Sequence, residues 1–112
     1  MKCILSNSYK KIVFNLEDVN YVLEDDSCLI YFDGGRVESV MYYSINDSLL
    51  KNLNRVYNCK LKKSVHINIG NVKECEFGTL GKVVFKDGSE IENLSGFDLK
   101  NLNDKLTNNV NL

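Results

Sequence analysis

The sequence predicts a mainly β domain with short helices at its edges, and three observations lead to this fold class. Short runs rich in valine, isoleucine, phenylalanine and tyrosine fill the first half of the chain and return in the second half. Aspartate and glycine pairs separate many of these runs, as expected for hairpin turns. The two segments with helical periodicity do not alternate with strands, which argues against a parallel α/β sheet.

The length and composition fit one small globular domain. A chain of 112 residues suffices for a single hydrophobic core, and its hydrophobic fraction of 44% is ordinary for a soluble protein. No apolar run is long enough to span a bilayer, and the apolar stretch near the N-terminus is too short for a signal peptide. We therefore expect a cytoplasmic protein with no membrane partner.

Four strand-like runs fill the first half of the chain, with turn chemistry between them. Asp25-Asp26-Ser27 and Asp33-Gly34-Gly35 suit hairpins, because glycine tolerates the positive φ of tight turns and aspartate bonds its own backbone. The acids of this half therefore have a partly structural role. The expected strands cover residues 11–16, 19–24, 28–32 and 36–43.

The hydrophobic period changes after these runs. Ser44 is placed to cap a helix, and Asp47 stands three residues later, as in a capping box. Residues 44–56 are therefore predicted to form one helix. Its apolar face would consist of Ile45, Leu49, Leu53 and Val56.

Strands return in the second half. The first of them places His66, the only histidine of the chain, on its polar side. Gly70-Asn71 turns the chain into the next strand, and Asp87-Gly88 is the expected tight turn of a final hairpin. The expected strands cover residues 64–69, 72–77, 82–85 and 89–94.

A second helix is predicted at the end of the domain. Ser95 and Asp98 form another capping-box arrangement, and Leu99, Leu102 and Leu106 recur on one helical face. The chain is accordingly divided into an N-terminal segment 1–9, one domain 10–106 and a frayed tail 107–112.

The near-neutral net charge of −1 hides an uneven distribution. From Glu17 to Asp47 there are eight acids and one base, whereas the window from Ser48 to Lys73 has six bases and no acid. The densest basic segment holds Lys60, Lys62 and Lys63. A local positive patch attracts phosphate, because distant acids are largely screened at physiological salt. The alternative is a plain solvated surface.

No motif indicates an enzyme, a metal site or a cofactor. The four cysteines form no C-x-x-C pair, and one histidine cannot complete a usual zinc set, so buried reduced thiols are expected. The carboxylate pairs Asp25-Asp26 and Glu90/Glu92 are expected to be solvated rather than catalytic. We expect His66 to be a surface or hydrogen-bonded residue.

The order of the elements and one motif resemble the LytTR DNA-binding domain of bacterial transcription regulators. The motif lies in CKLKKSVHINIGNVKE (59–74), where Lys62 and Lys63 take the places of the family's His and Arg. Ser64, Val65, Ile67 and Asn68 fall on the family's Ser, aromatic, Val and Asn. The segments that resemble the family's strands and helices around this motif are 17–35, 44–53 and 83–102, so the likeness covers about residues 10–106.

This resemblance implies a compact stack of mostly antiparallel sheets that places loops in successive major grooves of duplex DNA. The implied DNA-contact elements fall on Asp25–Ser27, Lys60–Ser64 and Ser95–Asp98. Two of them depart from the family pattern. The first is acidic at Asp25 and Asp26, and the third has Gly96 and Phe97 where the family has arginines.

The resulting hypothesis is a stand-alone LytTR-like bacterial transcription regulator without a receiver domain. Lys60, Lys62 and Lys63 would contact phosphates or base edges of duplex DNA, with Ser64 and Lys100 assisting at the DNA backbone. Besides duplex DNA, the expected partner is either another protein or a second copy of the chain bound on DNA. The alternative is a degenerate LytTR-like domain that acts by protein contact, for example by sequestering a true LytTR regulator.

Overall fold

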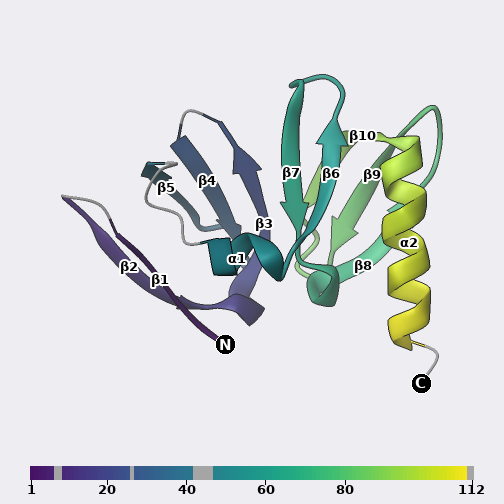
Figure 1. Cartoon of the computed structure of the whole chain (residues 1–112). Helices are drawn as coiled ribbons and strands as arrows, with labels where there is room; N and C mark the ends of the chain where they lie inside the picture. The colour runs from purple at the N-terminus through teal and green to yellow at the C-terminus, as the bar shows by residue number, and fades with distance from the viewer. Residues whose placement is uncertain (7–8, 26, 42–46, 111–112) are drawn as a thin grey trace.

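The computed structural model describes residues 1–6, 9–25, 27–41 and 47–110, which form mainly antiparallel β-structure (Figure 1). A small sheet pairs β1 (Lys2–Ser6) with β2 (Lys11–Asn15). A larger sheet contains β3 (Val19–Glu24), β4 (Ser27–Phe32), β5 (Val37–Met41), β6 (Asn54–Asn58), β7 (Lys63–Ile67), β8 (Val72–Glu76), β9 (Leu80–Phe85) and β10 (Glu90–Ser95). Its strand order is β5-β4-β3-β7-β6-β10-β9-β8. The predicted mainly β fold class is confirmed.

The strands of the first half follow the prediction closely. β3 has the predicted bounds, and β2, β4 and β5 lie within one or two residues of theirs, except that residues 42–43 fall outside the described part of the chain. The turn between β4 and β5 contains Gly34 and Gly35 at φ +88° and +96°, which are conformations that L side chains rarely adopt. The predicted glycine turn is therefore confirmed.

β1 lies inside the N-terminal segment 1–9, for which the sequence analysis predicted no strand. It pairs with β2 from Lys2 opposite Asn15 to Ser6 opposite Lys11. Cys3 and Leu5 face inward and join the same core cluster as Phe14. A five-residue run with only two buried side chains gives little periodic signal, so this strand is visible only once its partner is known.

The predicted helix 44–56 is wrong in its second part. The structure has a short helix, α1 (Asp47–Lys51), and then the strand β6 (Asn54–Asn58). Leu53 and Val56 are both buried, but Val56 faces the core from a strand whose exposure alternates. Asparagine is a poor helix former, and pairing of β6 with both β7 and β10 satisfies its backbone. The predicted cap at Ser44 and the predicted face residue Ile45 lie outside the described residues.

The second half contains the predicted strands and closing helix. The helix α2 (Gly96–Val110) buries Leu99 and Leu102 and partly buries Leu106, as predicted, and it extends into the segment expected to be frayed. The Asp98 N–H lies 3.5 Å from the Ser95 Oγ, which is the predicted cap at the limit of hydrogen-bonding distance. Gly81 of β9 lies directly beneath Leu99, where a Cβ would clash.

Two hydrophobic clusters stabilise the fold. One is built from β1–β4 and α1, and the other from β6–β10 and α2 together with residues of β3 and β4. Asp87, in the β9–β10 turn, accepts hydrogen bonds from the Gly34 N–H at 3.0 Å and from Asn20 Nδ2 at 3.1 Å, so it joins the two parts of the chain. None of the helices in the described residues is long and apolar enough to cross a membrane.

Candidate nucleic-acid interface

Two connections, the end of one strand and the start of a helix lie along one end of the larger sheet. The strand pairing at that end places Leu23 opposite Val65, and Asn58 opposite both Lys63 and Leu94. In Figure 1 the end of β3, the β6–β7 and β8–β9 connections and the start of α2 lie at the same, upper end of the molecule. We call this end the loop edge and define it as residues 25, 59–63, 77–79 and 95–98. It brings the three predicted DNA-contact elements to one side of the fold.

The basic turn of the loop edge is held by one buried asparagine. Asn58 is only 3% exposed, and its Oδ1 accepts hydrogen bonds from the backbone N–H groups of Lys60 at 3.1 Å and Leu61 at 2.9 Å. Its Nδ2 donates to the Glu92 backbone carbonyl at 2.9 Å, which anchors the turn on β10. Lys62 closes the turn with φ +57°, and its N–H donates to the Asn58 carbonyl. The lysines therefore stand on a preformed turn.

The three lysines of this turn differ in their partners. Lys63 forms an ion pair with Asp25 across the β3–β7 pair, with Nζ 2.6 Å from Oδ2. Lys60 and Lys62 are exposed, and neither has an ion-pair partner among the residues that the structure describes. The acidic first element and the basic second element thus face each other, and one positive charge of the loop edge is neutralised within the chain.

Ser64 and Lys100, the assisting residues of the hypothesis, lie in different environments. Ser64 is only 7% exposed, and its Oγ accepts a hydrogen bond from Arg55 Nε at 2.7 Å. The Ser64 hydroxyl is therefore already engaged by the exposed Arg55 of the neighbouring strand β6. Lys100 is exposed in the first turns of α2, one helical turn beyond Phe97.

His66 has a structural environment. It is 7% exposed, and its Nε2 lies 2.8 Å from Glu24 Oε1, on the neighbouring strand β3. The side of β7 that the sequence marks as polar is thus buried, because β7 lies in the middle of the sheet. This is the hydrogen-bonded environment that was one of the two expectations for this residue.

Burial disfavours the thiolate form of three of the four cysteines. Burial raises the pKa of the Cys3 and Cys75 thiols, and it raises the pKa of Cys28 to about 12, with the Glu24 charge adding to the effect. All four thiols are free of disulfides. Across the described residues, no group of three His, Cys, Asp or Glu side chains is arranged to hold a metal ion.

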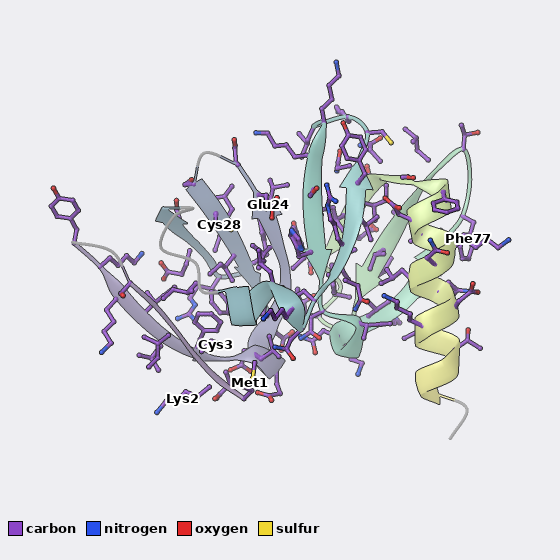
Figure 2. All side chains as sticks on the ribbon, viewed as in Figure 1. Met1, Lys2, Cys3, Glu24, Cys28 and Phe77 are labelled. Carbon is purple, nitrogen blue, oxygen red and sulfur yellow. The ribbon has the colours of Figure 1, made fainter. Side chains whose placement is uncertain are left out.

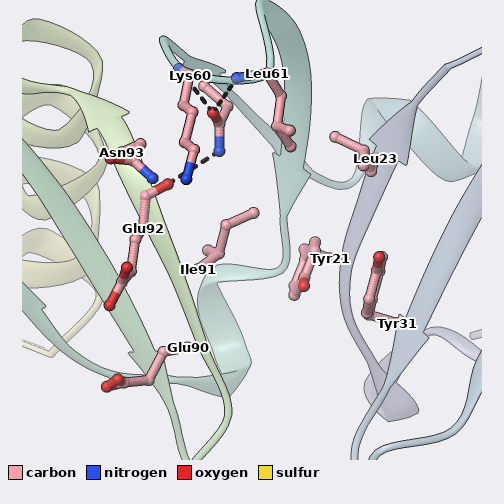
Figure 3. A pocket seen from close by; sticks show the side chains of 10 residues that line it. Tyr21, Leu23, Tyr31, Lys60, Leu61, Glu90, Ile91, Glu92 and Asn93 are labelled. Carbon is pink, nitrogen blue, oxygen red and sulfur yellow. Dashed lines mark hydrogen bonds between the residues drawn. The ribbon is translucent and has the colours of Figure 1, made fainter.

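An open pocket of about 380 Å³ lies beside the basic turn (Figure 3). Lys60 and Leu61 of the turn border it on one side, and Tyr21 and Tyr31 line the other. The two tyrosine rings stack at 4.2 Å between centroids, and burial raises the pKa of Tyr21, with the neighbouring Tyr31 and Asp87 adding to the effect. The lining mixes apolar, acidic and basic groups without converging on one chemistry.

Comparisons with known proteins agree with this geometry at the level of the fold. The chain has the fold of a LytTR DNA-binding domain. A solved structure similar to it is the LytTr DNA-binding domain of a protein described as a methyl-accepting/DNA response regulator from Bacillus cereus. The two share 11% sequence identity over 95% of each chain, with a TM-score of 0.57. Neither the protein-family models nor the curated proteins include a match to this sequence.

The sequence predicts the positive charge of the loop edge but not the residues that hold, neutralise and adjoin it. It did not identify Asn58 as the residue that holds the basic turn, although an asparagine directly before a turn is a familiar signal. It also did not anticipate that Asp25 pairs with Lys63, or that apolar side chains gather at the start of α2. These features depend on strands that are distant in the sequence and adjacent in the sheet.

Proposed function

We propose that the protein binds duplex DNA through the loop edge and acts as a bacterial transcription regulator. The observation that carries this proposal is the preformed turn that presents Lys60 and Lys62 beside Lys63, on a fold shared with a LytTR DNA-binding domain. A turn that is ordered without DNA loses little conformational entropy on binding, so its charges act at full strength. Lys100, exposed in the first turns of α2, is expected to add a further phosphate contact.

The lysines contact the phosphate backbone more than the base edges. An ammonium group is a compact point charge with no planar fork, so it suits phosphate better than bidentate recognition of a base. Each phosphate that a lysine neutralises releases counterions, which makes the affinity fall with salt. The positions of these lysines on one turn suit contact with neighbouring phosphates of one groove edge.

A salt titration with charge-reversal variants tests the proposal. The first step is genome-wide capture of DNA fragments by the purified protein, followed by affinity measurements on a captured fragment at several salt concentrations. We expect the plot of log K against log salt to flatten by about 0.9 for each phosphate that a variant no longer neutralises. The triple variant Lys60→Glu, Lys62→Glu, Lys63→Glu should lose most of its affinity.

A matched control separates local contact from net charge. Lys11, Lys51 and Lys73 are exposed and lie outside the loop edge, and none has an ion-pair partner among the described residues. Their triple replacement by glutamate changes the net charge by the same amount. Absence of DNA binding at low salt would refute the proposal, and so would an equal drop in affinity for the two triple variants.

The ion pair between Asp25 and Lys63 favours a second candidate function. By neutralising one lysine, it reduces the attraction of the loop edge for phosphate. A LytTR-like domain with weakened DNA contact could bind a true LytTR regulator and withhold it from its operator. Gel-shift competition with a purified LytTR regulator of the same genome would test this, because sequestration removes that regulator's shifted band without a new DNA complex.

A further inference from the structure

Three exposed apolar side chains adjoin the basic turn at the loop edge. Phe97, Phe77 and Leu80 are 76%, 58% and 46% exposed, which is unusual for large apolar residues standing together. We call these three residues the apolar rim. Figure 2 shows Phe77 beside the first turns of α2. The function proposed above, which rests on the lysines, does not account for them.

The fold brings the apolar rim together from three elements. Leu80 begins β9 and lies opposite Ser95, the last residue of β10. A Cβ on Gly96 would lie 3.4 Å from the Gly78 carbonyl oxygen, so the β8–β9 connection that begins with Phe77 lies against the start of α2. Phe97 follows directly on α2. Phe77 and Leu80 line one pocket together with the charged side chains of Glu76, Lys82 and Glu92, and Phe97 stands next to them along the edge at the start of α2.

The apolar rim is continuous with the basic turn. The Tyr57 N–H donates to Asp98 Oδ2 at 2.8 Å, and the Cys59 N–H donates to the Asn93 carbonyl at 2.9 Å. The first bond fixes the beginning of α2 against β6, the strand that leads into the basic turn, and the second joins the start of that turn to β10. Phe97 and Lys100 are three residues apart and therefore share one side of the helix. Phe97 and one cation, Lys100, thus lie on the same side of α2, and the start of this helix adjoins the strand that leads into the basic turn.

This mixture suits DNA better than a protein partner. The central parts of protein–protein interfaces favour aromatic residues but are depleted in lysine. Here Phe97 shares a side of α2 with Lys100, and Lys60 and Lys62 stand on the turn that follows the neighbouring strand β6. A surface that combines cations with apolar groups is complementary to a groove that has phosphates on its borders and an apolar group on its floor. In the major groove, that apolar group is the thymine C5-methyl.

We propose that Phe97 packs against thymine methyl groups in the major groove and thereby gives the DNA contact a preference for thymine. The inference rests on the DNA-binding function proposed above. The loop edge contains no arginine, so the bidentate contact that usually reads guanine is absent from it. Apolar contact with thymine is the sequence-reading chemistry that its side chains provide.

Replacing thymine by uracil tests the proposal, because uracil pairs identically and lacks only the methyl group. The probe is one captured DNA fragment, synthesised with thymine or with uracil at every T position. We expect the protein to bind the uracil form about fourfold more weakly for each methyl group contacted, from about 0.8 kcal/mol per buried carbon. Phe97→Ala should bind both forms alike, near the affinity of wild type for the uracil form.

The controls keep the two proposals separate. Tyr9→Ala truncates an aromatic residue that is 97% exposed and precedes β2, outside the loop edge, and it should retain the full thymine preference. Equal binding of wild type to the thymine and uracil forms would overturn the thymine contact and leave the DNA-binding function standing. No binding to either form at low salt would overturn both. A Phe97→Ala variant that self-associates less but keeps the thymine preference would overturn the inference in favour of a protein contact.

Discussion

At the scale of single residues, one ion pair within the chain lowers the positive charge of the loop edge. Asp25 occupies the first DNA-contact element of the resemblance, and its charge is paired with Lys63 of the second. Both side chains are about a third exposed, so the pair is worth little to folding stability. Its larger consequence concerns binding, because a lysine that is already paired attracts phosphate less.

Removing the acid should therefore strengthen DNA binding. We expect Asp25→Asn to raise the affinity for a captured fragment at low salt and to steepen the salt dependence by about 0.9 in log–log slope, as one more lysine reaches a phosphate. Fluorescence anisotropy at two or more salt concentrations measures both quantities. Asp104→Asn removes an exposed acid of α2 outside the loop edge and serves as the control. An unchanged slope in Asp25→Asn would show that Lys63 does not contact DNA.

At the scale of elements, the docking of α2 depends on one close approach. Leu99 projects onto Gly81 of β9, and a Cβ there would also lie 2.5 Å from the Glu76 carbonyl oxygen. This backbone oxygen cannot move without disturbing the β8–β9 pairing. The glycine is therefore required for packing rather than for a special backbone conformation.

Substitution of this glycine should loosen the helix that carries Phe97 and Lys100. We expect Gly81→Ala to lower the free energy of unfolding by about 1–3 kcal/mol, the usual cost of overpacking a core. Urea denaturation followed by circular dichroism measures the change. Gly70→Ala is a matched control, since its Cβ would meet only Asn68 Oδ1 at an ordinary 3.5 Å. Equal stability of the two variants would contradict this account of the contact.

Strands and helices could be predicted where the local sequence pattern and the tertiary packing favour the same structure. β3, β4 and the final hairpin combine β-branched, aromatic and other apolar residues with turn residues at their ends, so their strands could be predicted from local sequence alone. The stretch around Leu53 and Val56 has spacing that fits a helix as well as a strand, and pairing with β7 and β10 decides for the strand. Only tertiary structure carries that information.

The candidate site could likewise be predicted only in part. The basic segment 60–63 is visible in the sequence because its charges are close together. The pairing of Lys63 with Asp25 and the gathering of Phe77 near Phe97 need adjacent strands and a docked helix. A local pattern predicts charge, but it does not predict which opposing charge or apolar group will lie beside it.

At the scale of the whole molecule, Asp87 links the two parts of the chain at the end opposite the loop edge. Partial burial alone would raise the pKa of Asp87, but hydrogen bonds from Ser89, Gly34 and Asn20 outweigh that effect and hold the pKa below its usual value. A depressed pKa in the folded state means that the ionised carboxylate stabilises the fold. This contribution is fully present above the unfolded-state pKa, near 4, and is lost as the pH falls through the lower folded-state value.

Acid unfolding should reveal this link. We expect the wild-type melting temperature to fall from about pH 5 downward, across the range of carboxylate titration. Asp87→Asn should be less stable at neutral pH and should show a weaker pH dependence in that range. Differential scanning calorimetry between pH 7 and pH 3 measures both effects, with Asp104→Asn as a control that keeps the wild-type profile. Identical profiles for Asp87→Asn and wild type would rule out this role for Asp87.

The left-handed backbone of Lys62 has a further consequence. At φ +57° a glycine or asparagine would relieve steric strain, yet the chain has an exposed lysine there. At this position folding favours glycine or asparagine, whereas binding of an anionic partner would favour lysine. If the proposed DNA contact holds, Lys62 is a point where the molecule gives up stability to keep a charge, as is common at ligand-binding positions.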